Sequence, residues 1–306
     1  MNVVRSWAQL VRLPNLPTAF ADITLAGLAT GLLLARWDVF VLLLCASGCL
    51  YLAGMAWNDF FDVEQDRRER PGRPIPSGRI SRRQAGLGAT LLMLIGVLAA
   101  SLAGQRLAQY DPEAVSWLPP LLALVLCGAI LFYDAIAKHL PVGPLAMGAC
   151  RSLNVLLGVS IAGSLVRPLG PYLALVVGLY IVGVTWFART EAAVSSRQAL
   201  GGAALTILVS LVLTVPVPVM RSEGMASPLF VYLLVLFGFW LGFALWRAIE
   251  SPTPGHVQTG VKRALMGLIL LDTTLALASA GTVGLVLLVL LVPSLYLNRQ
   301  RWLYAT

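Results

Sequence analysis

Charged side chains are scarce in this chain. Lysine, arginine, aspartate and glutamate make up 12% of its 306 residues, while hydrophobic residues reach 58%. Soluble domains average about 25% charged residues. The shortage of charged residues therefore excludes an ordinary soluble domain and indicates an integral membrane protein.

Histidine and cysteine are scarce as well, with 2 and 4 residues. No Cys-x-x-Cys pair occurs, and neither His139 nor His256 has a partner at metal-ligand spacing. The sequence therefore gives no sign of a metal site built from these residues. The four cysteines fall within apolar segments, where we expect them to pack as small apolar residues: Cys45, Cys49, Cys127 and Cys150.

Apolar runs of about 20 residues recur along the chain, each long enough to cross a bilayer. They are continuous rather than alternating, which excludes a β-barrel. We therefore expect an all-α polytopic membrane protein with a single domain over 1–306. The stretch 264–297 is too long for one ordinary span, and Gly281 and Gly284 could divide it, which leaves nine or ten spans. The other expected spans lie near 17–35, 39–57, 86–105, 117–137, 142–163, 172–190, 199–219 and 228–247.

The basic residues are distributed unequally between the loops on the two sides of the membrane. If the amino terminus is cytoplasmic, most of them fall on the cytoplasmic side, and the other side receives Arg36, Arg106, Arg167 and Arg221. Such a bias orients a membrane protein, so the formal net charge of +8 is no signature of nucleic-acid binding. We expect a multi-pass protein of a bacterial cytoplasmic (inner) membrane. Arg299 and Arg301 would join the positive side if the last stretch crosses twice, which favours ten spans.

An acidic motif follows the second expected span. It reads Asn58-Asp59-Phe60-Phe61-Asp62-Val63-Glu64-Gln65-Asp66. Its aspartates are spaced by three and four residues, which on a helix puts three carboxylates on one face. They repel one another unless a cation lies between them, and Mg²⁺ typically takes one or two carboxylates plus substrate phosphates. We predict a magnesium site at Asp59, Asp62 and Asp66. The alternative is a solvated helix end.

Arginines follow at once, in a loop that contains Arg70-Pro71-Gly72-Arg73-Pro74-Ile75-Pro76-Ser77-Gly78. Guanidinium groups pair bidentately with phosphate oxygens, so an acidic cluster beside an arginine cluster suits a magnesium–diphosphate pair. We expect Arg70 and Arg73 to bind phosphate. Arg82 and Arg83 fit the positive-inside bias alone.

These motifs resemble the first signature of the UbiA-type intramembrane prenyltransferases. The match covers the aspartate spacing, the string Arg73-Pro74-Ile75-Pro76-Ser77-Gly78 and the position after the second span. Tyr133 and Lys138 resemble that family's tyrosine-plus-lysine loop, and Asn154 resembles its asparagine in the fifth span. The resemblance implies a bundle of about nine helices around a central cavity. It also implies a polyprenyl or isoprenoid diphosphate bound through Mg²⁺, with Asn58 and Lys138 in the site, and a prenyl group transferred to a lipophilic or aromatic acceptor.

The family's second acidic motif is reduced here. The corresponding stretch contains Phe187-Ala188-Arg189-Thr190-Glu191, in which Glu191 is the one acid. Its pattern resembles the EboC-like branch of the family. Two interpretations stay open: Arg189 supplies a fixed positive charge in place of a second metal, or the diphosphate step is slow, altered or lost. We include Glu191 among the catalytic candidates and Arg189 among the substrate-binding ones.

Arg151 is a charge within the fifth span, and Asn154 lies three residues further on. Intramembrane charges usually face a cavity or a partner. Arg151 either contacts the diphosphate or pairs with an acid on another helix, for which Asp272 is the candidate. Asp22 and Asp134 are expected to be structural or interfacial.

Three functional hypotheses remain. The first is a prenyltransferase, and the second is a non-catalytic lipid- or metabolite-handling protein that retains only the first motif. The third is a transporter, which would favour internal repeats and charges at the membrane midplane. The acidic motif instead stands at the end of a span, so the first hypothesis is preferred.

Overall fold

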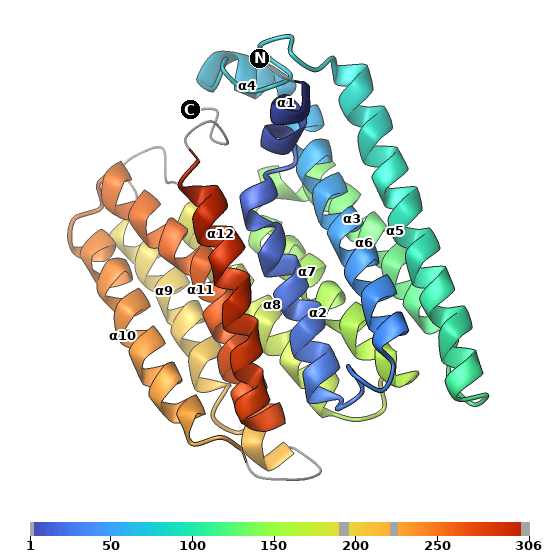
Figure 1. The fold of residues 1–306 in the computed structure, drawn as a ribbon. Coiled ribbons are helices and arrows are strands. Elements are labelled where there is room, and N and C mark those ends of the chain that lie inside the picture. The colour runs from blue at the N-terminus through green and yellow to red at the C-terminus, as the bar shows by residue number, and fades with distance from the viewer. Residues whose placement is uncertain (1–2, 190–195, 221–225, 301–306) are drawn as a thin grey trace.

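The computed structural model describes residues 3–189, 196–220 and 226–300. They form a bundle of helices that run side by side, with both described ends of the chain on the same side of the bundle (Figure 1). Seven helical stretches of the described chain are long and apolar enough to cross a membrane, so the predicted all-α polytopic fold is confirmed. The elements are α1 (Val3–Leu10), η1 (Leu13–Asn15), α2 (Leu16–Ala29), α3 (Trp37–Phe61), α4 (Val63–Glu69), α5 (Arg82–Tyr110), α6 (Leu118–Ala135), η2 (Ala137–His139), α7 (Gly143–Val159), η3 (Ser160–Ala162), α8 (Leu169–Ala188), α9 (Arg197–Val212), η4 (Val217–Met220), α10 (Leu229–Glu250), α11 (Pro254–Ala280), η5 (Gly281–Leu290) and α12 (Leu291–Asn298).

Local sequence fixes where several helices begin. α5 starts at a capping box, in which Ser81 Oγ accepts from the Gln84 backbone N–H and Gln84 Oε1 accepts from the Ser81 N–H. α6, α7 and α11 each carry proline in their first turn, where its missing N–H costs nothing. The long helices therefore begin at defined residues, next to the loops that carry most of the polar side chains.

The expected long last span reverses direction at Gly281. The φ of Gly281 is 79°, in the left-handed region, which favours glycine. Helix α11 ends immediately before this residue. The 3₁₀ helix η5 and α12 then return along α11, and a Cβ on Gly284 would lie 2.6 Å from the Leu277 backbone nitrogen. Ser294 Oγ on α12 donates to the Pro14 carbonyl. The stretch 264–297 is thus two antiparallel segments, the second of the two arrangements that its sequence allowed.

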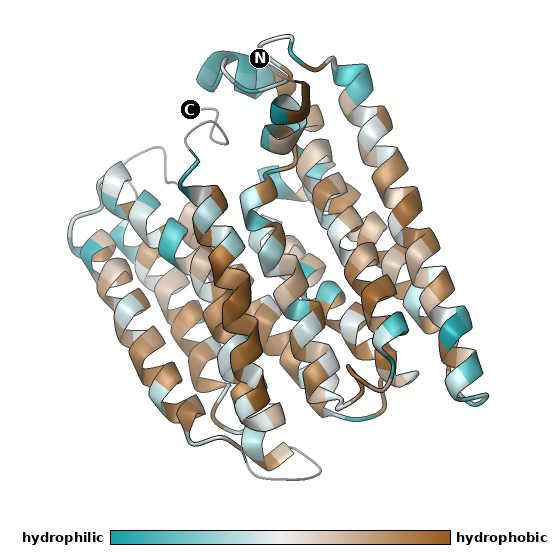
Figure 2. Cartoon of the chain, in the orientation of Figure 1, coloured by the Kyte–Doolittle hydropathy of each residue, from teal (hydrophilic) through white to brown (hydrophobic). Residues whose placement is uncertain are grey.

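Hydrophobic residues predominate in the middle of the bundle, and hydrophilic residues are more frequent toward the helix ends, most clearly at the end that carries α4 (Figure 2). Many large apolar residues on the outer helix faces are exposed, such as Leu94 and Leu98 on α5 and Leu236 and Phe239 on α10. Exposing this much apolar surface to water would be unfavourable, whereas contact with lipid is not. The packing agrees with an integral membrane protein.

A polar cluster lies inside this apolar bundle and joins three helices. Arg151 Nε on α7 is 2.8 Å from Asp22 Oδ2 on α2. Asn154 Nδ2 donates to the same Asp22 oxygen at 2.7 Å, and Ser47 Oγ on α3 donates to Asn154 Oδ1 at 2.7 Å. The acid that pairs with Arg151 is therefore Asp22, and the expectation that Asp272 fills this role is wrong.

Asp272 on α11 is fully buried beside Asp22. Neither of its carboxyl oxygens has a hydrogen-bond partner among the described residues, and Asp22 Oδ1 has none either. Two adjacent buried carboxylates would repel each other strongly. A proton on Asp272 removes that repulsion. We infer that Asp272 is neutral, so that the cluster holds one negative and one positive charge.

This arrangement predicts that the two acids respond differently to the same substitution. Asp22→Asn leaves Arg151 as a buried charge without its counterion, which should destabilise the fold by about 3–5 kcal/mol. Asp272→Asn replaces a neutral donor by another neutral donor and should leave stability nearly unchanged. Thermal unfolding in detergent, followed by tryptophan fluorescence, measures both. Equal destabilisation by the two variants would show that Asp272 is charged.

Candidate functional site

The acidic motif occupies a bend between two helices. α3 ends at Phe61, α4 begins at Val63, and Asp62 stands between them. Asp59 and Asp66 are each 3% exposed, whereas Asp62 is only partly buried and Glu64 is exposed. The bend, rather than one continuous helical face, brings the carboxylates together. Local spacing alone pointed to a straight helix because it contains no information about what packs on the motif.

Arg73 joins the two buried aspartates. Its Nη1 lies 2.7 Å from Asp66 Oδ2 and 3.2 Å from Asp59 Oδ1. Arg12 Nη2 reaches the same Asp59 oxygen at 3.2 Å and Asn58 Oδ1 at 2.9 Å. Burial is the largest single influence on the pKa of Arg12 and lowers it. Asp59, Tyr51 and Asp134 together raise the pKa by more, so the net shift is upward and the guanidinium stays charged.

The loop between α6 and α7 supplies a third cation. Lys138, in η2, places its Nζ 2.5 Å from Asp62 Oδ1. The motif and this loop are more than 70 residues apart in sequence, so only the packing of α6 against α3 brings them together. All three motif aspartates thus have a basic partner in this structure.

These groups line a polar cavity of about 480 Å³ at the end of the bundle. Five basic and three acidic side chains take part, so the cavity has an excess of positive charge. Its charged lining residues are Arg12, Arg70, Arg73, Lys138, Arg189, Asp62, Asp66 and Glu69, with Asn58, Gln65, Tyr133 and Thr185 also contributing. Such a recess is suited to a multiply charged anion together with a cation held by the carboxylates.

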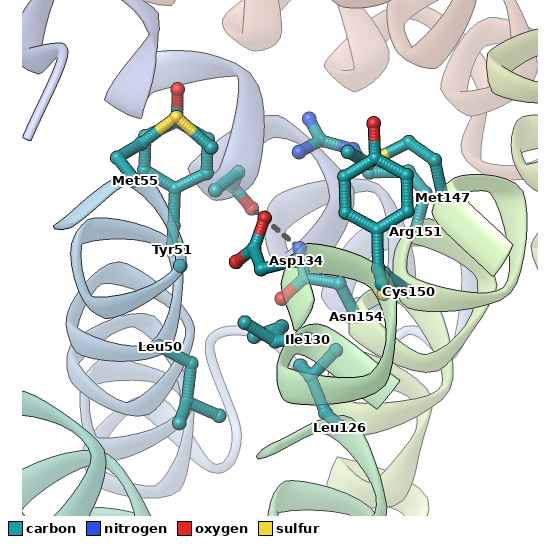
Figure 3. Close-up of a pocket in the computed structure, with 13 residues that line it drawn as sticks. Leu50, Tyr51, Met55, Leu126, Ile130, Asp134, Met147, Cys150, Arg151 and Asn154 are labelled. Atoms are coloured by element: carbon teal, nitrogen blue, oxygen red, sulfur yellow. Dashed lines mark hydrogen bonds between the residues drawn. The ribbon is translucent and has the colours of Figure 1, made fainter. Parts of the chain in front are cut away.

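An apolar cavity lies directly below, between α2, α3, α6 and α7 (Figure 3). Leu50, Leu126 and Ile130 form part of its wall, and Asp134 and Arg151 are its charged lining residues. Tyr133 lines both cavities. The polar cavity therefore adjoins an apolar one, the arrangement that a ligand with a charged head and an apolar tail requires.

Two candidate phosphate-binding residues lie away from the polar cavity. Arg151 and Asn154 line the apolar cavity instead, and Asn154 uses its amide oxygen on Ser47 and its amide nitrogen on Asp22 and the Ala19 carbonyl. In this structure both belong to the buried polar cluster.

Of the reduced second motif, Arg189 lines the polar cavity, where its guanidinium donates to the carbonyls of Leu140 and Pro141. These carbonyls belong to the turn that follows Lys138. Arg189 therefore holds the end of α8 next to the Lys138 loop. Glu191 lies outside the described residues.

Sequence reasoning gives Arg12 no place in the site and expects Asp134 to be structural or interfacial. Arg12 is the one non-glycine residue of the described chain with positive φ, at 46°, a conformation uncommon for such residues. Asp134 is 3% exposed and accepts from Asn58 Nδ2 at 3.0 Å. In the sequence, the signal for Asp134 is its position next to the candidate residue Tyr133.

The donor set fits Mg²⁺. Among the described residues, no three histidine, cysteine or acidic side chains group into a complete ligand set. Mg²⁺ does not need one, because it usually binds one or two carboxylates and takes its other oxygens from phosphate and water. Asp62 and Asp66 both face the polar cavity and supply carboxylates of this kind.

The bridging role of Arg73 can be tested by its removal. Arg73→Gln leaves Asp66 without its ion pair and Asp59 with Arg12 alone, so we expect a loss of about 3–5 kcal/mol in stability. Arg67→Gln is the matched control, because Arg67 makes only an exposed pair with Glu64, worth less than about 1 kcal/mol. Thermal unfolding of both variants in detergent decides the matter. Similar unfolding temperatures would contradict the bridging role.

The sequence is similar to a family of membrane prenyltransferases and to individual enzymes of that type. Residues 16–255 match the UbiA prenyltransferase family. Digeranylgeranylglyceryl phosphate synthase of Methanothrix thermoacetophila is 34% identical over 151 residues, 49% of this chain and 52% of that protein. The enzyme of the same name from Methanothermobacter thermautotrophicus is 33% identical over 162 residues, 51% of each chain. The chain thus spans about half the length of these curated relatives.

Solved structures agree with the fold. A UbiA homologue from Aeropyrum pernix K1, in its apo form, has a TM-score of 0.60 at 18% identity, covering 90% of this chain and 98% of that one. A UbiA homologue from Archaeoglobus fulgidus, bound to DMAPP and Mg²⁺, has a TM-score of 0.56 at 16% identity, covering 86% and 99%. Because the family match extends over most of the sequence, this chain belongs to the UbiA prenyltransferase family.

Proposed function

We propose that this protein transfers a prenyl group from a prenyl diphosphate to a lipophilic or aromatic acceptor, with Mg²⁺ as cofactor. The observation that carries the proposal is the pair of adjoining cavities. One is rich in carboxylates and basic groups, the other is apolar, and Tyr133 lines both. A prenyl diphosphate has the same two parts, a charged head and an apolar tail.

Asp62 and Asp66 would hold the metal, which supplies positive charge to the diphosphate as it leaves. Asp59 completes the motif, although its Oδ1 accepts from Arg12 and Arg73 in this structure. These arginines must move if Asp59 is to bind the metal directly. Otherwise Asp59 fixes both guanidinium groups at the edge of the cavity.

Arg70, Arg73, Lys138 and Arg189 would bind the diphosphate oxygens. Arg73 and Lys138 neutralise the aspartates in this structure. With a metal held by the carboxylates, Arg73 and Lys138 would be available to pair with phosphate oxygens, so that no buried charge would be left unpaired. Donors fixed at the position of developing charge are the largest source of catalysis in reactions of this kind.

The apolar cavity would hold the prenyl tail next to the breaking bond. Loss of the diphosphate leaves an allylic cation, and the cavity keeps water away from it until the acceptor attacks. The curated relatives are named digeranylgeranylglyceryl phosphate synthases, so geranylgeranyl diphosphate is the first donor to test. The basic residues around the site further support an orientation in which the polar cavity opens to the cytoplasm.

A second candidate function is binding of a prenyl diphosphate without turnover. It is favoured by the ion pairs that occupy all three motif aspartates and by Glu191 as the one acid of the second motif. A protein of this kind would carry or sequester an isoprenoid rather than transfer it.

The decisive experiment measures diphosphate release by purified protein in detergent with Mg²⁺ and geranyl, geranylgeranyl or longer diphosphates. A transferase should release diphosphate, and Asp62→Asn should lower the rate by about 100-fold or more, as expected for loss of a main electrostatic contribution. Glu64→Gln is the matched control, because Glu64 is exposed and does not line the cavity. Binding without release supports the second candidate, and neither binding nor release with any chain length contradicts both.

Glu191→Gln tests the reduced second motif separately. If Glu191 contributes to the metal site, the variant should need more Mg²⁺ for half-maximal diphosphate release. We expect a shift of about tenfold or more, in the range found when groups that support a metal site are removed. An unchanged Mg²⁺ dependence would show that the first motif acts alone.

A further inference from the structure

A second recess lies at the opposite end of the bundle from the polar cavity. It measures about 600 Å³ and lies where α2 ends and α8 begins. The polar cavity lies at the other end of α8, and the 20 residues of this helix separate the two by about 30 Å. The recess is therefore distinct from the proposed prenyl-diphosphate site.

Two arginines from distant parts of the sequence line this recess, Arg36 and Arg167. Few basic residues fall on this side of the membrane, and two of them share one cavity. No acidic residue is found among the described residues that line it. The nearby Asp38 instead accepts a hydrogen bond from Tyr110. Among the described residues that line it, the recess thus has positive charge without a neutralising acid.

The position of the first arginine is fixed by the fold. Arg36 Nη1 donates to the Ile161 carbonyl at 2.8 Å, at the end of the α7–η3 segment. Arg167 has no hydrogen bond or ion pair with any other residue in the part of the chain that the structure describes. One guanidinium is therefore anchored, and the other is available to a ligand.

The start of α8 adds a third source of positive potential. Leu169 and Gly170 line the recess, and the first N–H groups of a helix have no acceptor within it. Such a helix start attracts anions. A side chain at position 170 would come within 2.5 Å of Val159, so glycine lets the start of α8 approach α7 at the wall of the recess.

The rest of the lining is largely apolar, including Leu32, Val159 and Leu169. Trp37 and Trp117, each 63% exposed, stand at the starts of α3 and α6 at the same end of the bundle. Exposed tryptophans of this kind mark the level of the lipid headgroups. Positive charge at headgroup depth, above apolar walls, is complementary to an anionic phospholipid.

We propose that this recess binds one anionic phospholipid, with its phosphate between Arg36 and Arg167 at the start of α8 and its upper acyl chain along Leu32 and Val159. The site is independent of the proposed transferase activity and of the polar cavity. A bound lipid would contact the end of α2, the residue before α3 and the start of α8.

Native mass spectrometry of the purified full-length protein tests the site, with dioleoylphosphatidylglycerol as the probe and dioleoylphosphatidylcholine as the zwitterionic comparison. The wild type should retain the anionic lipid preferentially. Arg167→Gln should weaken retention by about fivefold, since one basic residue near a lipid surface contributes about that factor. Arg36→Gln/Arg167→Gln should abolish the preference.

Arg106→Gln is the matched control, because Arg106 belongs to the same membrane face but does not line the recess and is exposed beside Gln109. It should retain the lipid as the wild type does. Arg167→Gln removes no contact between described residues, so a folding defect is not expected, and its unfolding temperature checks this. Equal retention of both lipids, or equal loss in Arg106→Gln, would overturn the proposal. Full displacement by inorganic phosphate would assign the recess to a soluble anion and overturn the lipid.

Discussion

Burying a charge in a protein surrounded by lipid is costly, and the structure depends on how that cost is offset. Each buried aspartate at the motif has a basic partner from elsewhere in the chain. Arg73 forms ion pairs with Asp59 and Asp66, and Lys138 forms one with Asp62. These pairs determine where the loops after α3 and α6 can pack, and they thereby form the polar cavity.

The same constraint acts within the apolar interior. Arg151 could not remain there without Asp22, and Asp22 in turn orients Asn154 and Ser47. Asp272 is tolerated beside them only if it is neutral. The polar cluster therefore links α2, α3 and α7, and Asp272 of α11 is buried beside it.

The proposed function rests on charges that are paired but exchangeable. Arg73 and Lys138 neutralise the motif in this structure, and both face a cavity with space for a larger anion. Under the proposed function, both cations would pass from the carboxylates to the diphosphate when the metal is bound. The tail would lie in the neighbouring cavity, whose wall is mostly apolar.

The sequence by itself determined the class of protein, the approximate spans and the residues at the motif, because scarcity of charge and long apolar runs are properties of the chain alone. It also allowed the break at Gly281, which needs only a residue that tolerates positive φ. It could not determine that Arg12 reaches Asp59, that Asp22 rather than Asp272 pairs with Arg151, or that Arg36 and Arg167 share a recess. Those outcomes depend on which helices become neighbours, and neighbours are selected by packing and by the cost of unpaired charge, both of which arise only in the folded bundle.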